Sequence, residues 1–98
     1  MLTEEMIPAQ QFCIYHDIEI SFIHALHDYD LIEIIKLQEE IFVPKDQLQQ
    51  LEKLVRLHYE MDINLEGIET ITHLLQKVSM LQQHILELNN RLSSLENV

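Results

Sequence analysis

The sequence predicts a mainly α fold that contains one small β-hairpin and ends in a long coiled-coil helix. Hydrophobic residues make up 47% of the 98 residues and Gly occurs once, a composition that favours a folded, helix-rich protein over a disordered one. β-branched residues cluster after Asp30, and a heptad pattern fills the last part of the chain. The length allows one compact domain overall, in which residues 1–62 are expected to form the body and residues 63–98 the coiled-coil helix.

Two short helices joined by a turn are expected near the N-terminus. Residues 3–6 are expected to form a short edge strand, after which Pro8 suits the first turn of a helix that ends near His16. A turn near Asp17 then leads into a second helix over residues 19–29. The inward face of that helix is expected to be Ile18, Phe22, Ile23, Leu26 and Tyr29. The opposite face, which has no cation to offer a phosphate, carries Asp17, Ser21, His24 and Asp28.

A β-hairpin and a third helix are expected next. Ile32, Ile34 and Ile35 alternate imperfectly with polar residues, and the apolar run 41–43 follows a polar turn over residues 38–40. Pro44 closes the second strand, and Asp46 is expected to cap a helix of about fifteen residues. The apolar positions of that helix are Leu48, Leu51, Leu54, Val55, Leu57 and Met61.

The last helix has the strongest periodic pattern in the chain. Asn64 is its expected N-cap, and Glu66 lies in the first turn, where the helix dipole favours a negative charge. A coiled-coil seam, with spacings of three and four residues in alternation, is formed by Ile71, Leu74, Val78, Leu81, Ile85, Leu88, Leu92 and Leu95. One helix cannot bury this seam alone. Its length favours pairing with the same helix of a second copy, in either orientation, over folding back on its own body.

The charge of the chain opposes DNA binding. There are 17 Asp or Glu and 6 Lys or Arg, which gives a formal net charge of -11, and no Lys or Arg occurs among the first 35 residues. A duplex-binding domain gains much of its affinity by neutralising phosphates with basic side chains. The acidic field instead favours a basic partner and fast, salt-sensitive association. The alternative is an acidic surface that only keeps the protein soluble.

The order of the expected elements resembles the MerR-type winged helix-turn-helix, followed by a coiled-coil helix. The resemblance covers nearly the whole chain and includes the Asp-Ile-Asn-Leu-Glu-Gly-Ile sequence of residues 62–68. Regulators of this type begin their recognition helix with a pattern close to Val-Arg-x-Leu-Arg-Tyr-Tyr, whereas residues 20–26 here read Ile-Ser-Phe-Ile-His-Ala-Leu. Ser21 and His24 occupy the arginine positions, and Ala25 replaces an aromatic residue. The resemblance therefore implies the fold without the usual means of binding DNA.

Two short segments are similar to the chaperone modulator CbpM family, whose members resemble MerR proteins that have lost DNA binding. Residues 12–16 read Phe-Cys-Ile-Tyr-His, which is similar to the Phe-Cys-Leu-His of that family with one residue more. Residues 55–62 read Val-Arg-Leu-His-Tyr-Glu-Met-Asp, which is similar to Arg-Leu-x-x-Glu-Leu-x-Leu-Asp, and the Gly67–Ile68 pair also matches. This resemblance implies binding to the J-domain of a DnaJ/CbpA-type co-chaperone and inhibition of its action on DnaK.

The resemblance gives no matched interface positions, so the candidate site comes from charge alone. The densest acidic region of the sequence is expected to bind the partner, and no Lys or Arg precedes Lys36 in it. It comprises Asp17, Asp28, Asp30, Glu33, Glu39 and Glu40. Each of them could equally be an ordinary solvated carboxylate. Such charges mainly tune the association rate, and a few buried anchors such as Tyr29 or Phe42 would supply affinity.

Neither enzymatic chemistry nor a cofactor is expected. Cys13 and His16 lie one helical turn apart but lack a glycine-rich oxyanion turn and a third orienting group, so Cys13 is expected to be a small buried hydrophobe. His24 and His27, with Asp28 beside them, have a spacing compatible with a metal but offer too few fixed ligands. The sequence contains no nucleotide-binding loop and no dinucleotide fingerprint.

The sequence favours a cytoplasmic protein that does not enter a membrane. A single Cys excludes an internal disulfide and suits a reducing compartment. The first residues lack the basic and apolar regions of a signal peptide, and no stretch is apolar enough to cross a bilayer. Two functions remain: a homodimeric inhibitor of a J-domain co-chaperone, or a MerR-like dimeric transcription regulator that binds DNA. An acidic dimer with another partner is the third possibility.

Overall fold

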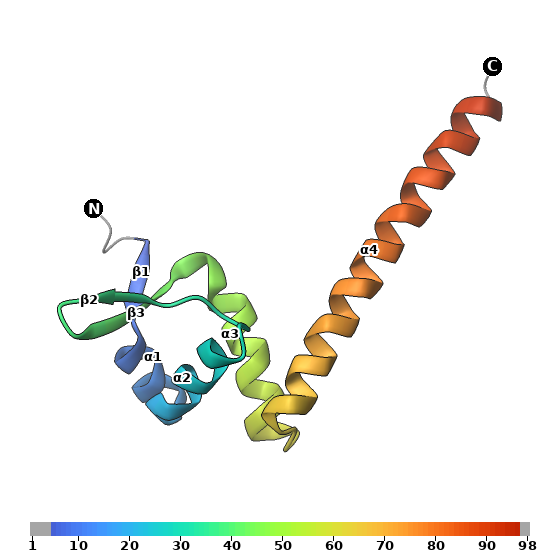
Figure 1. Ribbon diagram of the computed structural model, residues 1–98. Helices are drawn as coiled ribbons and strands as arrows, with labels where there is room; N and C mark the ends of the chain where they lie inside the picture. The colour runs from blue at the N-terminus through green and yellow to red at the C-terminus, as the bar shows by residue number, and fades with distance from the viewer. Residues whose placement is uncertain (1–4, 97–98) are drawn as a thin grey trace.

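One long helix projects from the rest of the structure, and the part of the described chain that precedes this helix, up to residue 64, is called the head (Figure 1). The computed structural model describes residues 5–96. Its elements follow in the order β1 (Met6–Pro8), α1 (Ala9–His16), α2 (Ile20–Asp28), β2 (Ile35–Leu37), β3 (Glu40–Pro44), the 3-10 turn η2 (Lys45–Gln47), α3 (Leu48–Val55), the π-helical turn η3 (Arg56–Glu60) and α4 (Leu65–Glu96). The 32 residues of α4 span about 48 Å. This helix therefore accounts for most of the 60 Å length of the molecule.

One hydrophobic core holds the head together. Its largest fully buried side chains are Ile23, Leu26, Val43, Leu51, Leu54 and Ile68. They come from α2, β3, α3 and the first turn of α4, so a single cluster fixes all four elements. The predicted inward face of α2 is confirmed, since Phe22, Ile23 and Leu26 are buried. Ile18 and Tyr29, which flank the helix, are partly buried and pack against the core.

The turn between α1 and α2 contains an aspartate in the left-handed conformation. Asp17 has a φ of 57°. Its N–H donates to the carbonyl of Ile14 at 3.3 Å, and the N–H of Ile18 donates to the carbonyl of Cys13 at 3.0 Å. This Schellman pattern usually places Gly at the left-handed position, which Asp tolerates better than most residues. The turn predicted near Asp17 is confirmed, and Asp30, with a φ of 60°, follows the end of α2 in the same way.

The three strands form an antiparallel sheet in the order β1-β3-β2. β2 and β3 are the predicted hairpin, and they meet at a two-residue turn in which Gln38 and Glu39 have φ values of 52° and 66°. Positive φ at both central residues is the type I′ geometry that matches the twist of paired strands. The strand boundaries differ from the prediction because Glu40 already pairs with Leu37, and Ile32 lies buried in the core instead of in β2.

The short N-terminal strand lies later in the chain than predicted. β1 pairs with β3 so that Met6 lies opposite Pro44 and Pro8 opposite Phe42. The N–H of Lys45 donates to the carbonyl of Glu5 at 2.8 Å and continues this pairing by one bond. The first residues of the predicted strand, 3 and 4, lie outside the described residues.

The predicted cap of the third helix is wrong. Asp46 lies inside η2, and Gln47 occupies the N-cap position of α3 without a side-chain capping bond. The side-chain oxygen of Gln47 instead accepts a hydrogen bond from the N–H of Glu33 at 2.8 Å. Gln47 therefore ties the loop before the hairpin to the start of α3.

The third helix ends by widening into the π-helical turn η3. The N–H of Met61 donates to the carbonyl of Arg56 at 3.2 Å, and the N–H of Ile63 donates to the carbonyl of Leu57 at 3.0 Å. Asp62, with a φ of 56°, then redirects the chain. The prediction that Met61 packs inward is wrong, since its side chain is 63% exposed at the edge of this turn.

The predicted N-cap of α4 is confirmed. The side-chain oxygen of Asn64 accepts a hydrogen bond from the N–H of Gly67 at 2.8 Å, and its backbone carbonyl accepts one from Ile68 at 2.9 Å. A Cβ atom at Gly67 would lie 2.8 Å from Cγ2 of Ile63 and 3.1 Å from the capping oxygen. The only glycine of the chain therefore gives the cap its room.

Replacing the cap should destabilise the protein. We expect Asn64→Ala to lower the free energy of unfolding by about 1 kcal/mol, because the N–H of Gly67 loses its partner at the helix terminus. Urea unfolding at one protein concentration measures this change. The control is Asn90→Ala on an exposed turn of α4, where alanine should be neutral or slightly stabilising. Equal effects of the two substitutions would contradict the capping role.

Candidate protein-binding surfaces

The exposed face of α2 carries no cation. Ser21, His24, His27 and Asp28 are its exposed residues. The hydroxyl of Ser21 donates to a carboxylate oxygen of Glu19 at 3.2 Å, so an acidic group also lies at the start of the helix. A helix that reads DNA gains much of its affinity from Lys and Arg that meet phosphates, and Arg or Lys to guanine is the commonest specific base contact. The predicted polar face of α2 is confirmed, and within residues 20–28 it offers neither Lys nor Arg.

The structure places the six acidic candidates in three parts of the head. Asp17 lies in the turn before α2, whereas Asp28, Asp30 and Glu33 follow one another from the end of α2 into the next loop. Glu39 and Glu40 lie at the hairpin tip, and all six are exposed. Helix α2, which is about 13 Å long and ends at Asp28, separates that residue from Asp17. Asp17 shares a hollow with two carboxylates that the sequence did not single out, Glu52 and Glu60.

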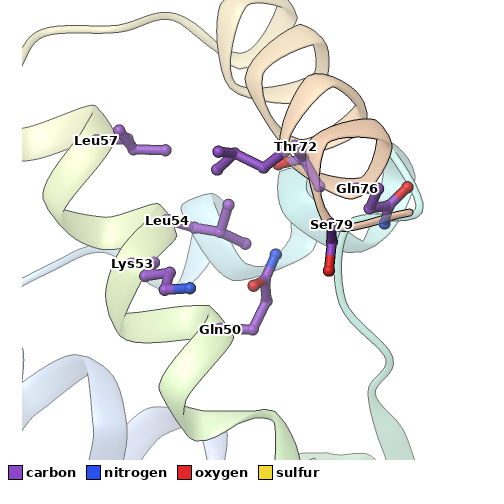
Figure 2. Close-up of a pocket in the computed structure, with 8 residues that line it drawn as sticks. Gln50, Lys53, Leu54, Leu57, Thr72, Gln76 and Ser79 are labelled. Atoms are coloured by element: carbon purple, nitrogen blue, oxygen red, sulfur yellow. The ribbon is translucent and has the colours of Figure 1, made fainter. Parts of the chain in front are cut away.

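A cleft of about 240 Å³ separates α3 from α4 (Figure 2). Its lining consists of Gln50, Lys53, Leu54, Leu57, Thr72, Leu75, Gln76 and Ser79. Figure 2 shows Leu54 of α3 and Leu57 of η3 pointing toward the side of α4 that carries Thr72. Thr72 is the last buried residue of α4 within the described chain, so the helix leaves the head at this point.

The apolar seam of α4 is uncovered along most of its length. Ile71 is partly buried near the head, while the other seven seam residues, Leu74, Val78, Leu81, Ile85, Leu88, Leu92 and Leu95, are 46–73% exposed. Figure 1 shows the helix running away from the head instead of lying along it. The helix therefore does not fold back on its own body, which was the alternative to pairing with a second copy.

Cys13, His16 and His58 pack against other side chains of the head. Cys13 is 5% exposed, and burial raises the pKa of its thiol. The ring of His16 lies 4.1 Å from the ring of Phe12, with its Nε2 3.9 Å from a carboxylate oxygen of Glu52. The ring of His58 stacks on another aromatic ring, and its Nδ1 lies 2.9 Å from a backbone carbonyl. A thiol held neutral by burial is a poor nucleophile, so the Cys13 and His16 pair does not resemble an activated nucleophile.

Neither a metal centre nor a membrane span is found in the described part of the chain. Among residues 5–96 no three side chains of His, Cys, Asp or Glu are grouped so that they could hold a metal ion. No helix within the same residues is long and apolar enough to cross a bilayer. The surfaces that stand out are therefore the acidic regions of the head and the apolar side chains that no other part of the chain covers.

A comparison with protein families identifies the fold. The family model described as MerR HTH family regulatory protein matches residues 7–90. This chain is a member of the MerR HTH family. The match runs from β1 through most of α4 and so includes the head and the exposed seam. The match shows a MerR-type HTH domain, and its description names a regulatory family. The chain matches no curated protein and no solved structure in the two further comparisons.

The buried thiol predicts slow modification of the native MerR-family chain. We expect Cys13 to react with Ellman's reagent much more slowly in the folded protein than in denaturant, because the buried thiol is both shielded and protonated. The release of the coloured thiolate measures both rates. Equal rates in the folded and unfolded states would show that Cys13 is accessible.

The same pKa shift predicts a pH dependence of stability. The thiol of the unfolded chain loses its proton near the ordinary pKa of 9.0, whereas that of the folded chain loses it at higher pH. The folded state therefore binds more protons in that range, and stability falls as pH rises above about 9. Unfolding across this range should show a smaller decline in Cys13→Ala than in the wild type; an unchanged decline would contradict this assignment.

Proposed function

We propose that this protein is a chaperone modulator that binds the J-domain of a DnaJ/CbpA-type co-chaperone and inhibits its action on DnaK. One observation carries the proposal: the exposed face of α2 has Ser21 and His24 where DNA-binding regulators of this fold have arginines. The fold of a DNA reader is thus present without the cations that hold phosphates. The segments that resemble the CbpM family support a protein partner in place of DNA.

The electrostatics of the chain suit the basic helix that J-domains present to DnaK. A formal charge of -11 over 98 residues produces a long-range attraction for a positively charged surface. The mechanism is competition: once this chain covers the basic helix, the J-domain can no longer contact DnaK and stimulate its ATP hydrolysis. Charged residues at the edge of such an interface accelerate encounter, while apolar contacts at its centre slow dissociation.

A DNA-binding regulator is the second candidate, because membership of the MerR HTH family favours it. Such a function needs the scattered cations of the head to lie on one surface. Lys36 is in β2 and Lys45 begins η2. Lys53 lines the cleft toward α4, whereas Arg56 lines a hollow against the α1–α2 turn. This distribution gives DNA binding less support than binding of a basic protein.

We further propose that the protein is a homodimer joined through α4. Leaving the seam of a 32-residue helix in water is unfavourable, and a second copy supplies the same apolar face by symmetry. β-branched residues at three of the four a positions and Leu at each d position favour a two-stranded coil. A dimer would carry two heads and could therefore bind two J-domains.

The partner proposal predicts salt-sensitive binding to a J-domain. We expect a calorimetric titration with the J-domain of a DnaJ-type co-chaperone from the same genome to give micromolar or tighter affinity at low salt. The affinity should fall at high salt because screening weakens the attraction between the acidic chain and the basic helix. An absence of heat at both salt concentrations, with the J-domain shown to be folded, would contradict the proposal. A DNA-shift assay on the upstream region of the gene would then test the second candidate.

The dimer proposal predicts that charges in the seam produce monomers. We expect Leu81→Glu combined with Leu88→Glu to shift the sedimentation coefficient to that of a monomer, because four carboxylates would enter a paired apolar seam. The matched control places the same charges on the outer face of α4, as Gln83→Glu with Asn90→Glu, and should remain dimeric. A wild type that sediments as a monomer at all concentrations would rule out the dimer.

A further inference from the structure

The outer face of α1 carries the two most exposed large apolar side chains in the described part of the chain. Ile14 is 74% exposed and Tyr15 is 83% exposed. Neither belongs to α4, so pairing of the α4 seam does not account for them. Single exposed apolar residues are ordinary on protein surfaces. These two, however, line a hollow with other apolar residues, and a continuous apolar patch beside polar groups is typical of an interaction site.

That hollow lies where α1, β1 and α3 meet. It has a volume of about 420 Å³, and the side chains of Ile7, Phe12, Ile14, Tyr15 and Leu48 give it a mainly apolar lining. Ile7 comes from β1 and Leu48 from the first position of α3, so three elements build the hollow. The ring of Tyr15 meets the ring of His16 edge-on, with 5.0 Å between the ring centroids, which helps to hold the tyrosine at the rim.

A second hollow of about 370 Å³ adjoins the first, since His16 and Glu52 line both of them. It carries the carboxylates of Asp17, Glu52 and Glu60, with Arg56 as the cation that shares the lining. We call the two hollows together the α1–α3 groove. The groove has an apolar end beside Tyr15 and an acidic end beside Glu60, along the thirteen residues from the start of α3 to the end of η3.

We infer that the α1–α3 groove binds the basic helix of the J-domain, with apolar side chains of that helix over Ile14 and Tyr15 and basic side chains at the acidic end. This inference rests on the proposed function and gives it a binding site. Helices commonly bind in grooves through apolar anchors spaced by three or four residues. Thirteen helical residues correspond to about 20 Å, enough to lie along three to four turns of a partner helix.

The charge of the groove selects a basic occupant. Three carboxylates exceed the one arginine at the acidic end, and the net charge of the whole chain has the same sign. The acidic candidates of the hairpin, Glu39 and Glu40, lack comparable apolar neighbours. Leu37 is the one exposed large hydrophobic residue of that hairpin. Tyr29, an anchor expected from sequence, packs partly buried against the core. Ile14 and Tyr15 therefore suit the role of anchors better.

The test compares groove and hairpin variants of the full chain in calorimetric titrations with the same J-domain. We expect Ile14→Ser with Tyr15→Ser to raise the Kd by about ten-fold or more, because truncated anchors lose their apolar contact. Glu60→Lys should raise the Kd and reduce its dependence on salt. The matched hairpin variants are Leu37→Ser and Glu40→Lys, which should bind as the wild type does. All variants alter exposed residues, and circular dichroism should show unchanged helicity and melting.

The outcomes separate the site from the function. If the wild type binds the J-domain and the groove variants bind equally well, the groove assignment is wrong and the proposed function stands. If the wild type does not bind, the proposed function fails and the groove assignment falls with it. If the variant at Ile14 and Tyr15 loses self-association while its affinity for the J-domain is unchanged, the groove binds a second copy of the chain. Weakened binding confined to the groove variants supports the inference.

Discussion

The small core of the head is the constraint on which the rest of the structure depends. Val43, Leu54 and Ile68 reach it from β3, α3 and α4, and the same cluster fixes the turn between the two short helices. A core of this size in a chain of 98 residues can cover only part of the apolar surface. It covers the first turns of α4 and the inner face of α1. What it leaves uncovered, the seam of α4 and the outer face of α1, is where partners would add contacts.

These two uncovered surfaces differ in chemistry and therefore suit different partners. The seam of α4 is apolar over several turns and suits a copy of itself, because symmetry supplies an identical face. The α1–α3 groove combines apolar side chains with carboxylates and suits a helix that is both apolar and basic. A separation of dimerisation from partner binding would let one dimer engage two J-domains without changing its own interface.

The acidity of the chain has a structural component as well as an electrostatic one. Asp17, Asp30 and Asp62 each have a positive φ within two residues of the end of a helical segment, and the hairpin turn uses Gln38 and Glu39 in the same conformation. A chain with a single Gly must place other residues at such positions, and Asp is among those that tolerate them best. Part of the negative charge thus follows from how the helices end, so an acidic residue at such a position does not by itself indicate a binding surface.

Local features of this fold were predictable from sequence, and features that join distant segments were not. The period of α2, the heptads of α4 and the cap at Asn64 depend on neighbouring residues, so their patterns are readable in the chain. The capping role expected for Asp46 failed because Gln47 bonds to Glu33, fourteen residues away in sequence. Similarly, the groove unites residues of β1, α1 and α3, and only folding brings them together.

The most direct test of the central claim is the ATPase activity of DnaK stimulated by the co-chaperone, measured over a titration with this protein. Competition for the basic helix predicts that stimulation falls to the basal rate as the protein saturates the J-domain, that added co-chaperone restores it, and that the basal rate of DnaK alone does not change. Stimulation that persists when the J-domain is saturated with this protein would contradict competition.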